Sequence, residues 1–173
     1  MKRVTTTLFI AAVCMVFAGC GKSSKELDEY YDSMNDFTTE ITTIKDNMES
    51  IDTSSETATM ELLGYLDQLE EQFRILSEIK VPKEFASNEQ LADEAYEYMQ
   101  EAVSLYHEYH DDPESDMSVF DAACENYSRA MKRVGYISSI LKGEMPEGDD
   151  IDVIEEDNTD FEPVTGDESE VEE

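Results

Sequence analysis

The stretch Leu27–Ile51, LDEYYDSMNDFTTEITTIKDNMESI, decides the fold of this 173-residue chain. Its apolar residues follow one another at spacings of 3, 4, 3, 4, 3, 4 and 3: Leu27, Tyr30, Met34, Phe37, Ile41, Ile44, Met48 and Ile51. Alternating steps of three and four place side chains on one face of a helix. The positions between them are mostly Asp, Glu, Thr, Ser and Lys, which suit a solvated face. The stretch therefore predicts a long amphipathic helix that packs against other helices.

A second helix is predicted after residues 52–56, DTSSE, which are poor helix formers in an interior position. Thr53 and Glu56 have the spacing of a capping box. The following apolar seam is Leu62, Leu66, Leu69, Phe73, Leu76 and Ile79, and Pro82 ends it. The heptad register continues through residues 52–56 without a slip, so a single helix over 25–80 remains an alternative.

Two further helices are predicted downstream. Ser87 with Gln90 forms another capping-box pair, and Asp111-Asp112-Pro113 ends the third helix. Ser118 is expected to cap the fourth helix and Gly143 to end it. The third seam is Leu91, Ala95, Tyr98, Ala102, Leu105 and Tyr109, with a second row of Tyr96, Met99, Val103 and Tyr106 beside it. The fourth seam is Phe120, Cys124, Tyr127, Met131, Val134 and Leu141.

Four helices of about 24 to 27 residues with short connections predict an all-α protein, an up-down-up-down four-helix bundle over residues 26–142. Residues 143–173 differ in composition: 15 of the 31 are acidic and none is basic. This composition predicts a disordered acidic tail. An EF-hand loop starting near Asp150 is excluded, because Ile154 and Glu155 stand where such a loop needs Asp or Asn and then Gly.

The amino terminus has the parts of a secretory signal peptide. Lys2 and Arg3 precede an uncharged apolar run, LFIAAVCMVFA, over residues 8–18, and small residues follow. The run is too short for a comfortable membrane span, which takes about 20 residues. Residues 1–19 are therefore predicted to be removed.

The segment Phe17-Ala18-Gly19-Cys20 resembles the lipobox of bacterial lipoproteins, in which an aliphatic residue, a small residue and Gly or Ala precede an invariant Cys. Phe17 departs from the usual Leu or Val. The resemblance implies cleavage before Cys20, diacylglycerol on its sulfur and a membrane anchor; residues 20–25 would be the lipidated tether. Two acyl chains hold a protein firmly on a membrane. An ordinary signal peptide with Cys20 as a thiol is the alternative.

Two more features resemble small lipoproteins of Gram-positive bacteria: the Cys20-Gly21 start with serines after it, and the connector Ile79-Lys80-Val81-Pro82-Lys83-Glu84-Phe85. The likeness implies an extracytoplasmic location on the outer face of the cytoplasmic membrane. In a Gram-negative cell the protein would lie in the periplasm or on the outer membrane. The likeness implies no activity.

The charge of the chain restricts its partners. The mature part keeps ten basic residues against 43 acidic ones, a net charge of −33. Such a chain cannot neutralise phosphates, so nucleic-acid binding is excluded as a function. Basic proteins or divalent cations are the electrostatic partners that fit.

Few residues offer chemistry. Cys124 has no intramolecular disulfide partner in the mature chain, and is either a buried small residue or a thiol for an intermolecular bond. His107 and His110 are three residues apart, so a surface metal site is one interpretation and a solvated helix end the other. The bundle metal motif would need Glu at position 104, which is Ser104, and position 107 is expected to face away from the seam.

No nucleophile–base pair or covalent haem motif is present, so an enzyme is not expected and no cofactor is assigned. Seven tyrosines lie on or beside the apolar seams, where packing explains them first and a tyrosine-lined pocket is the alternative. They are Tyr30, Tyr65, Tyr96, Tyr98, Tyr106, Tyr109 and Tyr127.

The fourth helix carries the one basic concentration, which is Arg129, Lys132, Arg133 and Lys142. These residues pair with acidic faces of neighbouring helices in one interpretation and hold the acidic tail in the other. As a whole, the sequence predicts a membrane-anchored extracytoplasmic lipoprotein that acts as a noncatalytic binding or scaffold module. The alternative is a helical-bundle lipoprotein that binds a metal or a small molecule.

Overall fold

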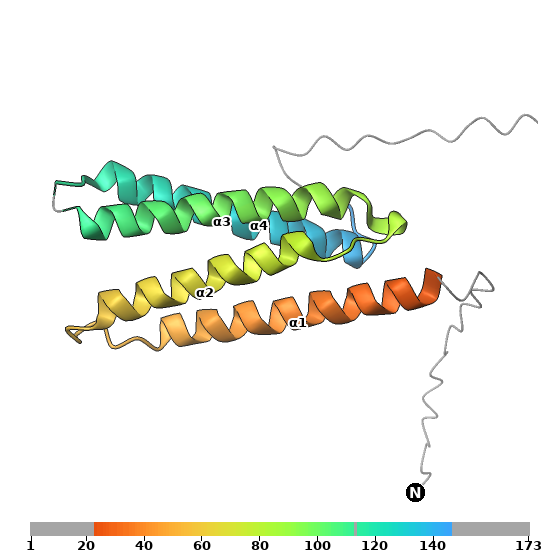
Figure 1. The fold of residues 1–173 in the computed structure, drawn as a ribbon, viewed down its shortest axis with the longest axis horizontal. Helices are drawn as coiled ribbons and strands as arrows, with labels where there is room; N and C mark the ends of the chain where they lie inside the picture. The colour runs from red at the N-terminus through yellow and green to blue at the C-terminus, as the bar shows by residue number, and fades with distance from the viewer. Residues whose placement is uncertain (1–22, 113, 147–173) are drawn as a thin grey trace, which may run out of the picture.

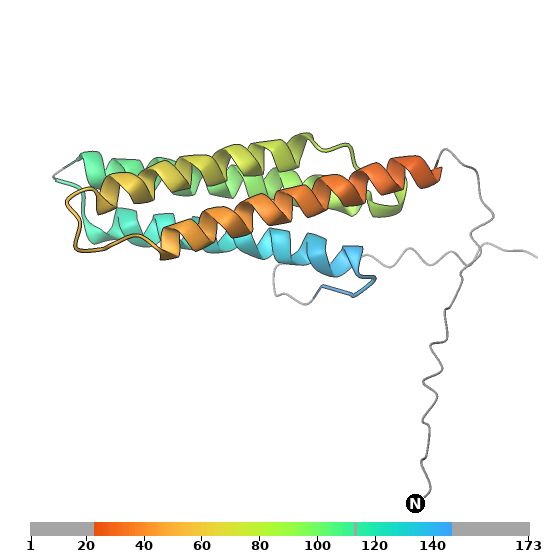
Figure 2. The ribbon, with the colours of Figure 1, turned by 90° about the horizontal axis from the view of Figure 1, so that it is seen from below.

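The computed structural model describes residues 23–112 and 114–146, which form four long helices and no strand (Figure 1). The helices are α1 (Ser23–Glu49), α2 (Ala58–Glu78), α3 (Ser87–Asp111) and α4 (Met117–Leu141), with a 3₁₀ turn, η1 (Lys83–Phe85), before α3. Consecutive helices run antiparallel, and the four lie side by side as an elongated bundle (Figures 1 and 2). The predicted all-α, up-down-up-down four-helix bundle is confirmed.

The predicted lengths hold for three of the four helices. α1 has 27 residues and α3 and α4 have 25 each, but α2 has 21 and is shorter than expected. α1 begins at Ser23, inside the range predicted as tether. The predicted signal peptide, Cys20 and the predicted disordered tail beyond residue 146 lie outside the described residues. Within the described part, no helix is both long and apolar enough to span a membrane.

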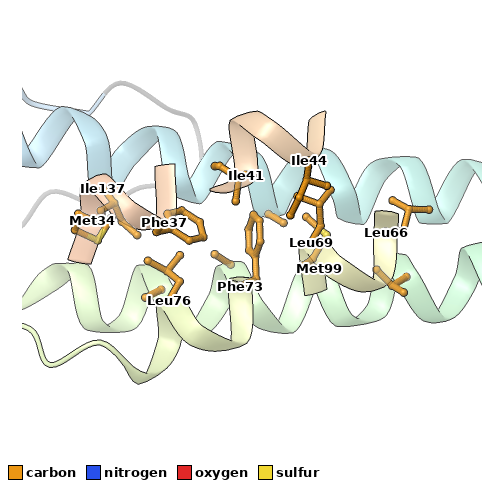
Figure 3. Packing of buried hydrophobic residues seen from close by; sticks show 14 of the residues in the cluster. Met34, Phe37, Ile41, Ile44, Leu66, Leu69, Phe73, Leu76, Met99 and Ile137 are labelled. Carbon is orange, nitrogen blue, oxygen red and sulfur yellow. The ribbon is translucent and has the colours of Figure 1, made fainter. Parts of the chain in front are cut away.

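The seam of α1 forms one wall of the core. Its members Tyr30, Met34, Phe37, Ile41 and Ile44 are all buried. Figure 3 shows Met34, Phe37, Ile41 and Ile44 of this row facing Leu66, Leu69, Phe73 and Leu76 of α2. Met99 of α3 and Ile137 of α4 belong to the same cluster. The rings of Phe37 and Phe73 meet edge to face with centroids 5.6 Å apart. Removal of these side chains from water is the main source of stability in such a bundle.

Helices α3 and α4 approach each other more closely than the other consecutive pairs do. The residues at their contact explain this, because Ala95 and Ala102 on α3 and Ala123 and Ala130 on α4 are fully buried. Interaxial distance depends on side-chain size at the contact. Alanine therefore brings these two backbones together, whereas Phe and Leu hold α1 and α2 further apart.

Residues 50–57 separate α1 from α2, so the alternative of one helix over 25–80 is wrong. The Asp52 carboxylate accepts hydrogen bonds from the Ser54 backbone N–H at 3.0 Å and from the Ser54 hydroxyl at 2.6 Å. The Thr57 backbone N–H donates to the Ser55 hydroxyl at 3.2 Å. These local bonds give the backbone an alternative to the helix. Heptad register alone does not detect that competition.

All three predicted capping residues are wrong in position. α2 begins at Ala58, after Thr57, whose hydroxyl donates to the Glu61 carboxylate at 2.5 Å, so Thr53 and Glu56 form no capping box. At α3, Ala86 precedes the helix in αR conformation because η1 leads directly into it, and Ser87 is already the first helical residue.

Gln90, the predicted partner of Ser87, also behaves differently. Gln90 donates to the Glu94 carboxylate at 2.8 Å rather than reaching back to the helix start. At α4, Asp116 is the N-cap, and its carboxylate accepts from the Ser118 backbone N–H at 2.7 Å. The Ser118 hydroxyl also donates to this carboxylate, and the hydrogen bonds from the hydroxyl and the backbone N–H of Ser118 hold the pKa of the Asp116 carboxyl below its usual range.

Gly143 ends α4, as predicted. Its φ of +73° lies in the left-handed region that glycine adopts without strain. The Glu144 N–H donates to the Ser139 carbonyl at 2.9 Å, and the Gly143 N–H donates to the Ile140 carbonyl at 2.9 Å. This pair of bonds is a Schellman motif, which reverses the direction of the chain after the helix.

Candidate functional site

One end of the bundle is defined by the start of α1. At this end, here called the anchor end, α1 and α3 begin and α2 and α4 end, and η1 closes it (Figures 1 and 2). The opposite end, here called the far end, holds the α1–α2 and α3–α4 connections. Cys20 itself lies outside the described residues. Only Gly21 and Lys22 separate it from the first residue of α1.

Charge is distributed unevenly between the two halves of the bundle. Residues 37–67 and 100–128 make up the far half, and they carry 15 acidic residues and a single lysine, Lys45. The anchor half, over residues 23–36, 68–99 and 129–146, carries 14 acidic and eight basic residues. The far half therefore has the more negative net charge, and Lys45 is its one basic residue in the sequence.

The anchor end contains a cleft of about 280 Å³ between the first turns of α1 and the end of α2. One ion pair crosses it, with Lys80 Nζ 3.0 Å from Glu26 Oε1 of α1. Glu29, also in its wall, pairs within α1 with Lys25, whose Nζ lies 2.9 Å from Glu29 Oε1. The Glu29 pair raises the pKa of the Lys25 ammonium. Because each of these carboxylates already has a cationic partner, the cleft presents no concentrated charge to a ligand.

Beneath the cleft lies a buried polar pair that sequence patterning did not predict. Asn88 of α3 is 0% exposed, and its Nδ2 donates to the Tyr30 hydroxyl of α1 at 3.0 Å. No hydrogen-bond donor of the described residues reaches Asn88 Oδ1. Burial raises the pKa of the Tyr30 hydroxyl. Asn88 lies three residues before Leu91, the first residue of the apolar seam of α3. This heptad spacing could have indicated that Asn88 faces the core.

The two histidines do not converge on a common point. His107 Nε2 lies 2.7 Å from Asp67 Oδ1 of α2, and both side chains are exposed at the margin between α2 and α3. His110 packs its ring edge to face on Tyr109, with centroids 5.3 Å apart. Among the described residues, no cluster of three or more His, Cys, Asp or Glu side chains is arranged to hold a metal ion.

The seven tyrosines on the seams are placed by packing. Tyr30 is buried, and the other six are half-buried at the margins of the core. Tyr30 is the one tyrosine in the wall of the anchor-end cleft. The structure therefore does not bring the tyrosines together around that cleft.

Cys124 sits between helices as a partly buried side chain. Its sulfur lies 3.3 Å from the Tyr106 hydroxyl, and the Tyr106 ring meets Phe120 edge to face. Burial and the neighbouring thiol raise the pKa of the Tyr106 hydroxyl. The packing role expected for Cys124 agrees with this position on the apolar side of α4.

A cluster of cations and aromatic rings lies across α3 and α4. This cationic–aromatic patch consists of Tyr98, Arg129, Lys132, Arg133 and Tyr136. The Arg129 and Arg133 guanidinium carbons each lie 5.6 Å from the Tyr98 ring centroid. Lys132 Nζ lies 5.6 Å, and the Arg133 guanidinium carbon 5.7 Å, from the Tyr136 ring centroid. Cations over aromatic faces are attracted by the ring quadrupole.

Carboxylates hold the two arginines of the patch in place. Arg133 is only 7% exposed, and its Nε donates to Glu94 Oε2 of α3 at 2.6 Å. Arg129 pairs with Glu125 one turn earlier on α4. The sequence identified the basic residues of this patch, but it gave no indication of Glu94, Tyr98 and Tyr136 as their neighbours. Those contacts depend on how α3 and α4 are rotated against each other.

Comparison of the chain with protein-family models, curated proteins and solved structures gives no match.

Proposed function

We propose that this protein is a lipid-anchored extracytoplasmic lipoprotein that acts as a noncatalytic binding or scaffold module. The observation that supports this proposal most strongly is the position at which α1 begins. α1 begins at Ser23, three residues after Cys20. Three Cα steps span at most about 11 Å. A lipid on Cys20 would therefore hold the anchor end of the bundle directly against the membrane.

The charge distribution supports the same orientation. Eight of the nine basic residues of the bundle lie in the anchor half, and the far half is the more acidic. Anionic headgroups repel acidic side chains over a Debye length of about 8 Å at physiological salt. The bundle would therefore stand upright, with its acidic far end carried outward by the length of α1, about 40 Å for 27 residues. A basic protein or a divalent cation is the partner chemistry that this end fits.

The anchor is tested by replacing Cys20 with Ser in the full precursor. We expect Cys20→Ser to appear in the medium or the periplasm with unchanged helical circular dichroism, and to lose lipid labelling. Cys124→Ser is the matched control, since it removes a thiol of the folded domain and should remain membrane-bound. Membrane retention of Cys20→Ser would overturn the proposal, because the uncleaved amino-terminal segment would then be the anchor.

The orientation is tested separately with fluorophores on single cysteines in the Cys124→Ser background. Lys83→Cys labels the anchor end, and Ser54→Cys labels the far end. In vesicles with quencher-labelled headgroups, we expect strong quenching at position 83 and little at position 54. Equal quenching at both positions would show that the bundle lies flat and that its far end is not presented outward.

A further inference from the structure

The cationic–aromatic patch combines the two properties that an acidic peptide needs in a binding surface. Arg129 and Lys132 are exposed and supply positive charge, and the half-buried Tyr98 supplies flat apolar area beside Arg129. Arg133 and Tyr136 are buried beneath them and support this surface from below. A guanidinium has five N–H donors in a planar fork. Arg129 pairs with one carboxylate, Glu125, and keeps the capacity to bridge a second one.

After α4 the chain turns back along the same helix. The Schellman motif at Gly143 reverses the backbone, and Figure 2 shows the described residues after α4 turning back alongside its final turns. A continuation in the same direction would follow α4 back toward its middle, where the patch lies. The direction of exit therefore favours a contact between the following residues and α4.

The residues after Glu144 can also reach the patch. Lys132 lies ten residues before Lys142, which is about 15 Å along a helix. An extended chain covers that length in about five residues at ~3.3 Å each. Counted from Glu144, this brings Asp149 and Asp150 to the level of Lys132 and Arg133.

The composition of the segment that would arrive there is complementary to the patch. Residues 147–157, EGDDIDVIEED, are here called the near tail; they contain seven acidic residues and no basic one. Ile151, Val153 and Ile154 lie between the acidic residues and can pack beside the half-buried ring of Tyr98. Charge-assisted hydrogen bonds to arginine are the stronger kind available to carboxylates.

We propose that the cationic–aromatic patch on α3 and α4 is a binding site for an acidic peptide, and that the near tail occupies it within the same molecule. A segment joined by a few residues is present at millimolar effective concentration, so even weak intrinsic affinity suffices for occupancy in cis. An acidic segment of another protein would have to displace the near tail first. This inference is independent of the lipid anchor.

The sequence provides a matched control for the experiment. The far tail, residues 158–173, also contains seven acidic residues. One variant of the mature lipoprotein in detergent carries Asn or Gln at all seven acidic positions of the near tail. A second variant carries the same changes in the far tail, so the two have equal net charge. Backbone hydrogen exchange of α4 is then compared at low salt.

We expect neutralisation of the near tail to speed amide exchange around the patch on α4 on the order of threefold or more, because the covering segment is lost. Neutralisation of the far tail should leave exchange unchanged. High salt should abolish the difference between the near-tail variant and the wild type, because screening weakens contacts between exposed charges.

A second measurement addresses the surface itself. Lys132→Gln should speed the same exchange in the wild-type chain but add little in the near-tail variant, and Lys45→Gln on α1 serves as its control. Equal effects of the two tail variants, or no effect of either, would overturn the proposal, because the tail would then act only through net charge or not contact α4.

Discussion

The buried pair Tyr30–Asn88 offers a test of how polar groups contribute to this core. Asn88 donates through Nδ2 to the Tyr30 hydroxyl at 3.0 Å, while its Oδ1 has no donor among the described residues. Tyr30→Phe removes the acceptor and leaves both ends of the amide without a partner among the described residues. A buried polar group that loses its partner costs about 1–3 kcal/mol. We expect Tyr30→Phe to lower the free energy of unfolding by that amount.

The double variant Tyr30→Phe/Asn88→Leu should behave differently. It replaces both polar groups by apolar groups of similar size, and such a replacement is nearly neutral or stabilising. We therefore expect its free energy of unfolding to equal or exceed that of the wild type. The double-mutant cycle should give a coupling larger than about 1 kcal/mol, within the range for residues in direct contact.

The assay is urea unfolding of the soluble Cys20→Ser mature chain, followed by circular dichroism. Tyr31→Phe is the matched control: this neighbouring tyrosine is 41% exposed and packs edge to face on Phe85. Its loss of a hydroxyl should change stability by less than about 0.5 kcal/mol. The reasoning about the unsatisfied amide is refuted if the free energy of unfolding lost in the double variant equals the sum of the losses in Tyr30→Phe and in Asn88→Leu.

Four further outcomes follow from the packing and the titrating groups. Phe73→Ala, in the fully buried centre of the core, should cost about 3–5 kcal/mol in urea unfolding, whereas Met60→Ala, 74% exposed, should cost almost nothing. Ala130→Leu should destabilise the α3–α4 contact by about 1–3 kcal/mol through overpacking, and an unchanged unfolding midpoint would contradict the close approach seen there. Burial raises the pKa of the Tyr106 hydroxyl above its usual value of 10.0, so the native state keeps this proton at a pH where the unfolded chain loses it, and stability falls as pH rises above 10. Melting temperatures between pH 9 and pH 11 should fall less in Tyr106→Phe than in the wild type, and equal slopes would rule out this group as a cause. Zinc or copper should leave the melting temperature unchanged, and a rise that disappears in His107→Ala would overturn the assignment of that histidine to the ion pair with α2.

The sequence alone determined the fold class and the buried face of α1. Steps of three and four residues place Tyr30, Phe37 and Ile44 on one face of a helix whatever lies opposite, and all three are buried. Gly143 was also predictable, because left-handed backbone after a helix favours glycine. The amino-terminal segment and the acidic tail stay predictions, since both lie outside the described residues.

Helix starts could not be read from the sequence with the same certainty. Thr53, Ser87 and Ser118 each have cap-forming side chains, yet none is the capping residue. A cap depends on the backbone conformation of the preceding loop, and loops such as 52–57 are set by local side-chain hydrogen bonds. Periodicity carries no information about those bonds.

Only the tertiary structure decided which groups meet between helices. The amide of Asn88 reaches Tyr30 of another helix, and Arg133 pairs with Glu94 while lying over Tyr98. Each contact depends on the rotation and axial position of one helix relative to its neighbour. An apolar seam fixes which face of a helix turns inward, but the side chains that meet across two helices are chosen by packing, and in α3 and α4 by the close approach that buried alanines allow.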